Sequence, residues 1–327
     1  MTTSLPFGSG PFTTSMAAAT GIERGQLRGW LRGGLVRHVL REVYVDNAVP
    51  DSPALRAQAA ALALPDHAVV CDRSAAWLHG VDLLDYVELD LVPALDAVSV
   101  GGPRASRRRE IFSGVRELSP SEITLVDGVR VTTPARTACD IACLRGRRRA
   151  LATLDAFRRQ FGLSKADLSA LLPRFARRRG VIQLRELIPL STYLADSQPE
   201  SWMRMMIHDA GLPMPEPQVE VYVPGWGEVR IENAYPHLRI GAEYDSDERH
   251  STDDELTHDR DRRAALRDEL SWHIIPVRRE GLSRRGSETW LRELRSVIAQ
   301  RTPYYPSKRI YSRGPDEPHR YRRTRLT

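Results

Sequence analysis

The stretch from residue 199 to residue 300 alternates short apolar runs with charged helical patterns, and this order limits the fold more than any other feature. PESWMRMMIHDAG has helical spacing and stops at Gly211, with prolines beyond it. QVEVYV, GEVRIENAY, LRIGAEYD and SWHIIPV have the composition and the bounding turns of strands. A charged helix (DDELTHDRDRRAALRDEL) is expected before the last of these strands, and an amphipathic helix (ETWLRELRSVIAQR) after it. The sequence therefore predicts an α-β-β-β-α-β unit over residues 196–302, followed by a disordered basic tail over residues 303–327.

Carboxylates gather at one end of these expected strands. Side chains alternate faces along a strand, so Glu243 and Asp245 share a face at the end of an apolar run. Glu232 is expected on the neighbouring strand, and Glu200 at the start of the first helix. Converging carboxylates are costly to desolvate, and a divalent cation such as Mg²⁺ or Mn²⁺ would compensate that cost. His250 follows the strand end and could contact a phosphate or transfer a proton.

The stretches VRIENAYPHLRIGAEYDSDERH and HDRDRRAALRDELSWHIIPV resemble the very-short-patch-repair-like endonuclease domains, which have the restriction-endonuclease-like fold of the PD-(D/E)XK group. The resemblance covers about 100 residues and implies a DNA endonuclease that needs a metal ion. In that reading Glu232, Glu243 and Asp245 hold the metal ion. Glu200 would support them, and His250 would contact the phosphate or the attacking water.

The match has departures that leave the activity open. Asp259 and Arg262 fill the places of the usual Asp-x-x-Arg helix, but Glu232 stands where Asp is usual and Ser246 where Gly is usual. The histidine lies one residue further on, and residues 196–302 contain no lysine. An active nuclease and an inactive nucleic-acid-binding relative are therefore equally open, because a fold by itself does not decide activity.

Near the other end of the chain, residues 12–46 have the order helix, turn, helix, hairpin. FTTSMAAATG and GIERGQLRGWLRGG have helical spacing, and LVRHVLREVYV is typical of two short strands. This is the order of a winged helix-turn-helix, whose second helix enters the major groove while its wing touches the DNA backbone. The alternative is a solvated face on a helical hairpin. The DNA-contacting side chains would be arginines of the second helix and the wing: Arg24, Arg28, Arg32, Arg37 and Arg41.

Residues 51–195 mix strands and helices and are expected to form a central α/β module, which makes the whole chain α+β, with a winged helix over residues 1–50. ITLVDGVRVTT contains an Asp-Gly pair, the signal of a tight hairpin turn. Cys71, Cys139 and Cys143 have no metal-ligand spacing, so buried reduced thiols are expected.

Three stretches, FTTSMAAATG…LRGWLRGGLVRHVLREVYV, VVCDRSAAWLHGV and VTTPARTACDIA, resemble in this order the N-terminal and central region of AbiEi-type antitoxin proteins of actinobacteria. The resemblance covers about the first 150 residues. It implies a winged-helix protein of type IV toxin–antitoxin and abortive-infection systems that binds double-stranded DNA. A cognate toxin stays open as a second partner, which the resemblance does not imply.

Composition is that of a folded protein, and its arginine-rich positive charge is explained equally well by an anionic partner and by a GC-rich genome. The net charge is +6 with a pI of about 9.5, and arginine supplies nearly all of the positive charge, since only Lys165 and Lys308 are lysines. No apolar run reaches the length of a membrane span, and the start has no signal-peptide layout, so a cytoplasmic protein is expected. Three functions stay open: a metal-dependent endonuclease, a non-enzymatic regulator of the antitoxin type, and a module that neutralises a partner protein.

Overall fold

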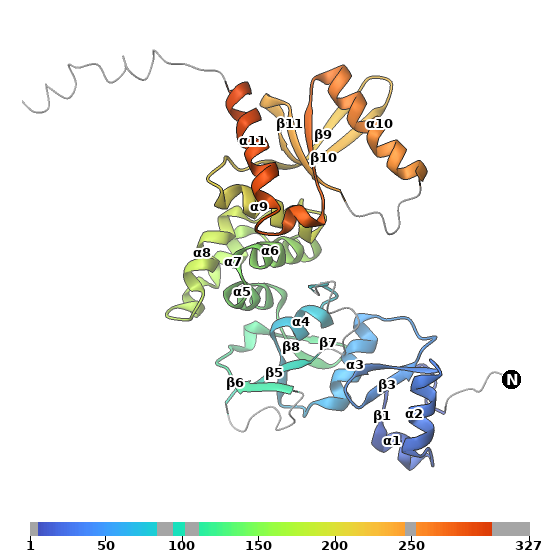
Figure 1. Cartoon of the computed structure of the whole chain (residues 1–327). Helices are drawn as coiled ribbons and strands as arrows, with labels where there is room; N and C mark the ends of the chain where they lie inside the picture. Colours follow the sequence, from blue (N-terminus) through green and yellow to red (C-terminus); the bar gives the residue numbers. More distant parts are fainter. Residues whose placement is uncertain (1–5, 84–93, 102–110, 246–252, 303–327) are drawn as a thin grey trace, which may run out of the picture. The chain divides into compact units, whose positions relative to one another are not determined.

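The computed structural model describes residues 6–83, 94–101, 111–245 and 253–302. The chain forms two compact units, Met1–Met205 and Met206–Thr327. Within the described residues the first unit holds a three-stranded and a five-stranded sheet, and the second holds a four-stranded sheet (Figure 1). The mixed α and β composition predicted from the sequence is confirmed. The expected basic tail, 303–327, lies outside the described residues.

The first unit begins with a small helix-and-hairpin layer, drawn in blue in Figure 1. The side chain of Thr13 accepts a hydrogen bond from the Met16 N–H and caps the first helix. The second helix ends at Gly33, and Gly34 takes a positive φ of 68°. The strands pair antiparallel in the order β1-β3-β2. The elements are β1 (Phe12–Thr13), α1 (Thr14–Ala19), α2 (Arg24–Arg32), β2 (Val36–Leu40) and β3 (Val43–Asp46).

A five-stranded mixed sheet follows, in the order β6-β5-β4-β8-β7. The predicted Asp-Gly turn is confirmed between β7 and β8, where Asp127 and Gly128 both have positive φ, at 44° and 82°. The elements are α3 (Pro53–Ala63), β4 (Ala68–Val70), α4 (Asp72–Leu78), β5 (Leu95–Ser99), β6 (Ile111–Val115), β7 (Ile123–Val126) and β8 (Val129–Thr132).

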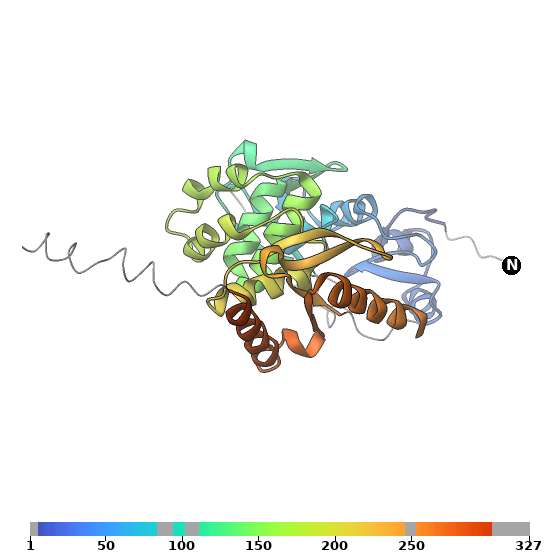
Figure 2. The ribbon, with the colours of Figure 1, turned by 90° about the horizontal axis from the view of Figure 1, so that it is seen from above.

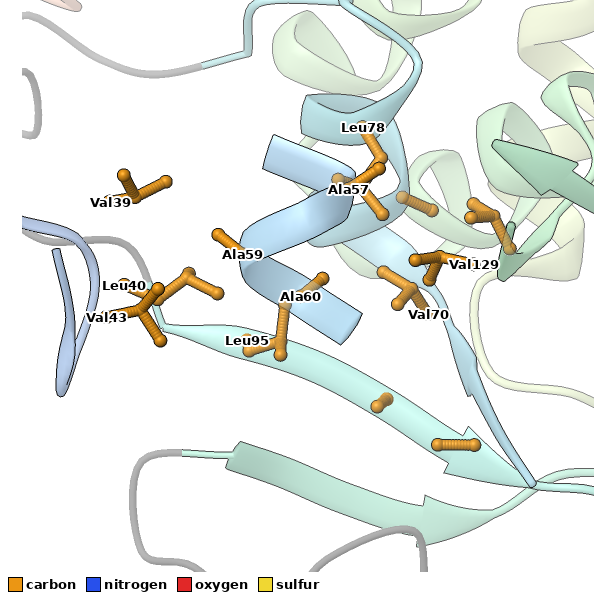
Figure 3. Packing of buried hydrophobic residues seen from close by; sticks show 14 of the residues in the cluster. Val39, Leu40, Val43, Ala57, Ala59, Ala60, Val70, Leu78, Leu95 and Val129 are labelled. Atoms are coloured by element: carbon orange, nitrogen blue, oxygen red, sulfur yellow. The ribbon is translucent and has the colours of Figure 1, made fainter. Parts of the chain in front are cut away.

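One hydrophobic core joins the N-terminal hairpin to the five-stranded sheet. Helix α3 lies between them, and its small residues allow close packing on both sides (Figure 3). Ala59 and Ala60 are fully buried, with Leu40 and Val43 from the hairpin and Leu95 from β5 in the same cluster. Residues before and after position 50 therefore share one core.

Helices complete the first unit. Their apolar faces form a second core around the buried residues Phe157, Leu168, Phe175 and Leu184. The helices are α5 (Pro134–Leu144), α6 (Arg147–Phe161), α7 (Lys165–Ala170) and α8 (Val181–Leu190), with the start of α9 (Gln198–Asp209), in which the contact boundary between the units falls.

The second unit has a four-stranded sheet in the order β12-β11-β10-β9, in which β11 and β12 are parallel and the other pairs antiparallel. Helix α10 runs beside the β9–β10 hairpin in the view of Figure 2, and its Leu266 is buried in the same cluster as Val223 and Ile231. The predicted order α-β-β-β-α-β is the observed order of elements, with α9 as its first helix. The elements after α9 are β9 (Glu216–Val223), β10 (Gly227–Tyr235), β11 (Ile240–Tyr244), α10 (Asp253–Leu270) and β12 (His273–Val277), and α11 (Ser287–Arg301) follows the last strand.

Candidate functional site

Three of the predicted DNA-contacting arginines lie along the exposed side of α2. Arg24, Arg28 and Arg32 are all exposed, while Leu27 is only 3% exposed and fixes the opposite side of the helix in the core. The Nε atoms of Arg28 and Arg32 donate to the carbonyl four residues earlier, at 3.3 and 3.4 Å. Helix α2 contains no acidic residue, so this face is a row of guanidinium groups without an opposing carboxylate on the same helix.

The face also carries Gly25 and Gly29, which the sequence analysis did not single out. Both glycines are exposed, and a Cβ added to either would have no atom within 4 Å. Glycine weakens an exposed helix interior by about 1 kcal/mol relative to alanine. Because nothing in the described part of the chain requires their small size, a partner that approaches the helix backbone closely would account for them. The signal that could have revealed them is the one-turn spacing of Gly25, Gly29 and Gly33 beside the arginines.

The two arginines expected on the wing differ in their surroundings. Arg41 is exposed and stands with Glu42 at the tip of the β2–β3 hairpin, where Glu42 has a φ of 61°. Arg37 is half-buried, and its Nη2 donates to the carbonyl oxygen of Val49 at 2.9 Å. Arg37 therefore links strand β2 to the segment after β3. A contact with DNA would have to use the same guanidinium that already donates to the Val49 carbonyl.

A hollow of about 620 Å³ opens beside this arginine face. Its lining combines apolar side chains such as Leu27 with hydroxyl-bearing and basic ones. The hydroxyl and guanidinium groups offer hydrogen-bond donors to a phosphate or a sugar. The polar residues lining it are Thr13, Thr14, Ser15, Arg24, Arg28, Glu42 and Tyr44.

In the second unit the strand register brings the predicted carboxylates together. Asn233 of β10 pairs with Ala242 of β11, so the next positions along the two strands are Glu232 and Glu243. Asp245 follows directly after the last residue of β11, and its N–H donates to the Val277 carbonyl of β12 at 2.9 Å.

Each of these carboxylates has a partner from the protein. Both oxygens of Glu243 are held by the guanidinium of Arg262 on α10, at 3.1 and 2.6 Å. Oδ2 of Asp245 accepts from Arg263 at 3.3 Å. Glu232 accepts a hydrogen bond from the Tyr244 N–H at 2.7 Å. Its carboxylate therefore replaces a backbone hydrogen bond between β10 and β11 at the point where the two strands separate. Arginines thus neutralise Glu243 and Asp245, whereas the backbone N–H of Tyr244 binds Glu232.

This donor set does not fit a divalent cation as it stands. Such a cation needs several carboxylate oxygens turned toward one point, whereas both oxygens of Glu243, which is 6% exposed, point at Arg262. Across the described part of the chain, no group of three or more His, Cys, Asp or Glu side chains could hold a metal ion. We therefore derive no catalytic step through a metal ion.

The two remaining predicted site residues are Glu200 and His250. Glu200 falls in the first unit, where it is 3% exposed and accepts the Asp196 N–H at 3.0 Å near the start of α9. His250 lies outside the described residues, as does the side chain of Asp259.

A buried charged network lies in the first unit, and the sequence analysis did not identify it. Arg136 of α5 is 1% exposed and contacts Glu122 at 2.6 Å and Asp140 at 2.8 Å. Asp140 also accepts from Arg116 and Arg178, both at 3.1 Å. Three arginines therefore converge on one buried carboxylate, which links α5 to the segments before and after it.

Glu122 is the other acid of the network. Burial alone would raise its pKa, but hydrogen bonds from Arg174, the Ser119 N–H and Arg136 outweigh burial and lower the pKa to about 2. Glu122 is therefore ionised at neutral pH.

The three cysteines are free thiols, as predicted, with Cys71 and Cys139 buried and Cys143 half-buried. Burial raises the pKa of Cys71, and burial with the nearby Asp140 carboxylate raises that of Cys143 to about 11. These thiols stay protonated at neutral pH and are poor nucleophiles.

Comparison with known proteins gives a family match and two close relatives. Residues 68–190 match the model of the AbiEi antitoxin C-terminal domain. The uncharacterized proteins MT2308 and Rv2248 of Mycobacterium tuberculosis (strains CDC 1551 and H37Rv) are each 33% identical over 247 residues, which covers 75% of this chain and 86% of theirs. The resemblance to AbiEi-type proteins is confirmed over residues 68–190, but the matching model is that of the C-terminal domain and does not cover the winged helix expected over residues 1–50. No helix among the described residues is long and apolar enough to cross a membrane.

Proposed function

This chain belongs to one family with the two Mycobacterium tuberculosis proteins and carries an AbiEi antitoxin C-terminal domain over residues 68–190, and from this we propose that it is a DNA-binding regulator of the antitoxin type. Its place of action is the cytoplasm, where it binds double-stranded DNA near its own gene. A cognate toxin of a toxin–antitoxin system is its proposed protein partner.

The observation that carries the proposal is the face of α2. Arg24, Arg28 and Arg32 lie in a row with no acidic residue on their helix. The order β1-α1-α2-β2-β3, with the sheet order β1-β3-β2, supports a winged helix-turn-helix whose second helix is α2. In that arrangement the α2 arginines contact phosphates or guanine edges, and Arg41 on the hairpin reaches the backbone.

The glycines of this face extend the argument. A helix enters the major groove only if its side chains leave room for the walls of the groove. Gly25 and Gly29 leave one strip of α2, beside the arginine row, without side chains, so the helix backbone is accessible there. The combination suits insertion into DNA better than a solvated surface, which would gain stability from alanine at both positions.

The test is the affinity of the full chain for the DNA upstream of its own gene and for random duplex of equal length, measured by fluorescence anisotropy. Wild-type protein is expected to prefer the upstream DNA by roughly 10³-fold or more. The Arg24→Ala, Arg28→Ala, Arg32→Ala triple variant should lose most of that affinity. Equal affinity of the triple variant and the wild type would reject the proposal.

The matched control removes three exposed arginines from the second unit: Arg284→Ala, Arg285→Ala and Arg292→Ala. It changes the net charge by the same amount as the α2 variant, so it should reduce binding only slightly if α2 is the contact. If both triple variants lose the same affinity, the effect comes from overall charge and not from α2.

A DNA endonuclease in residues 196–302 is the second candidate: the register sets Glu232 next to Glu243, and metal binding there would require Arg262 to leave Glu243. Its test is cleavage of supercoiled and linear DNA with Mg²⁺ or Mn²⁺ by the wild type and by a Glu243→Ala, Asp245→Ala double variant. Cleavage that the double variant lacks would support the candidate. Absence of cleavage by the wild type, or full activity of the double variant, would exclude these carboxylates as its site.

A further inference from the structure

The carboxylates at the end of the second unit's sheet already have a cation against them. We define the strand-end cluster as Glu232, Glu243 and Asp245. Arg262 approaches it from α10 and forms a two-pronged contact with Glu243, in which Nη1 meets Oε1 at 3.1 Å and Nη2 meets Oε2 at 2.6 Å. The side chains of Glu243 and Arg262 are 8% and 18% exposed. Ion pairs with this geometry and burial are strongly held, because water cannot replace either partner.

We propose that Arg262 is the resident cation of the strand-end cluster, and that a divalent cation can bind Glu232, Glu243 and Asp245 only when this guanidinium is removed. Acid patterns of this kind usually imply a metal ion, and here the protein supplies the positive charge from its own helix. The proposal concerns the second unit alone and does not depend on DNA binding by α2.

The neighbouring arginines do not fill the same role. Arg263 donates to Asp245 at 3.3 Å, and Arg278 lies 3.8 Å from the same carboxylate with 59% of its side chain exposed. Arg262 instead contacts both oxygens of the buried Glu243 carboxylate. Its removal would leave Glu243 buried and without that counter-charge.

The position of Arg262 follows from the sequence around it. α10 presents Arg262 and Arg263 in succession, and Leu266, one turn after Arg262, is fully buried in the apolar cluster of the sheet. The anchoring of Leu266 holds Arg262 over the end of β11. A guanidinium fixed in this way is pre-organised, so a dissolved Mg²⁺ ion, which sheds its water reluctantly, would have to displace it.

The test is isothermal titration of the intact chain with MnCl₂, repeated with MgCl₂. Wild-type protein should bind neither ion tightly at this cluster. Arg262→Met keeps the length of the side chain but removes its charge, and should bind Mn²⁺ at least about tenfold more tightly than wild type. The gain should vanish in the Arg262→Met, Glu243→Gln double variant. Arg267→Met, one turn later on the same helix, is the control and should behave as wild type.

Circular dichroism checks that each variant is folded. If Arg262→Met does not fold, Arg262→Gln replaces it, because the glutamine amide can still donate a hydrogen bond to Glu243. Equal Mn²⁺ affinity in wild type and in the folded Arg262 variant would overturn the proposal. So would a folded Arg262 variant that binds no Mn²⁺. DNA binding through α2 should be the same in all of these proteins, so that a failure here is distinct from a failure of the proposed function.

Discussion

At the scale of single residues, Arg136 is the most constrained charge in the first unit. It is 1% exposed, contacts Glu122 and Asp140, and stacks its guanidinium over the ring of Phe175 at 4.8 Å. Without it, Glu122 and Asp140 would keep only their more exposed arginine partners, and removing one member of a buried ion pair costs about 3–5 kcal/mol. Arg136→Met should therefore lower the free energy of unfolding by roughly that amount.

Urea denaturation of the full chain, followed by circular dichroism, measures this change. Arg185→Met, on an exposed position of α8, is the control and should change the free energy of unfolding by less than about 0.5 kcal/mol. A similarly small effect of Arg136→Met would show that the network is not important for stability.

Asp96 of β5 should make stability depend on pH. Burial, together with the charge of Asp72, raises its pKa from 3.8 to about 6. A carboxyl whose pKa is higher in the folded state stabilises the fold below the unfolded pKa, and that contribution is lost as the pH rises through about 6. Between pH 4 and pH 7 this loss amounts to about 1–3 kcal/mol.

Asp96→Asn cannot ionise and should reduce this fall in stability. Thermal unfolding of wild type and variant at pH 4, 5, 6 and 7 makes the comparison. The melting temperature of the variant should exceed that of wild type at pH 7 and approach it at pH 4. Parallel curves over the whole range would contradict the assigned role of Asp96.

At the scale of elements, α2 carries a prediction in which stability and function move in opposite directions. Alanine in place of Gly25 and Gly29 should stabilise the exposed helix by about 1 kcal/mol per position. Neither Cβ would meet an atom of the chain within 4 Å. If α2 enters a DNA groove, the same two methyl groups should weaken DNA binding. The Gly25→Ala, Gly29→Ala double variant is examined by thermal unfolding and by fluorescence anisotropy with the upstream DNA, and unchanged affinity would argue against close approach of α2.

The elements that can be predicted from the sequence are those that a few neighbouring residues determine. The hairpin at Asp127-Gly128 and the strands of the second unit follow from turn chemistry and alternation, which a few neighbouring residues determine. Helices α6 to α8 were not predicted individually, because arginine runs such as that at 147–149 obscure their apolar faces. Gly180, at the start of α8, is a case that no pattern reveals: a Cβ there would lie 2.0 Å from the carbonyl oxygen of Cys143.

The same limit applies to the candidate sites. The α2 arginines were predictable because one-turn spacing places them on a single face. The meeting of Glu232 with Glu243 was also predictable, from strand order and alternation. The pairing of Glu243 with Arg262 was not, because it depends on the rotation of a helix packed against the sheet. Long-range contacts of this kind decide whether a carboxylate cluster faces a metal ion or an arginine.

At the scale of the whole molecule, the N-terminal layer is built into the antitoxin domain. The β2–β3 hairpin shares its core with α3 and the five-stranded sheet, so the α2 face is carried on a rigid base (Figure 3). A chain with net charge +6 also attracts DNA in general. We propose that α2, and not overall charge, makes the contact with DNA.

The most direct measurement is the salt dependence of binding to the upstream DNA, for wild type and for the Arg24→Ala, Arg28→Ala, Arg32→Ala variant. Each phosphate contact contributes about 0.9 to the slope of log affinity against log salt concentration, so loss of three contacts should reduce its magnitude by about 3. The Arg284→Ala, Arg285→Ala, Arg292→Ala control should keep the wild-type slope. A variant of α2 with the wild-type slope would contradict the account, because the contacts that bind DNA would then lie elsewhere in the chain.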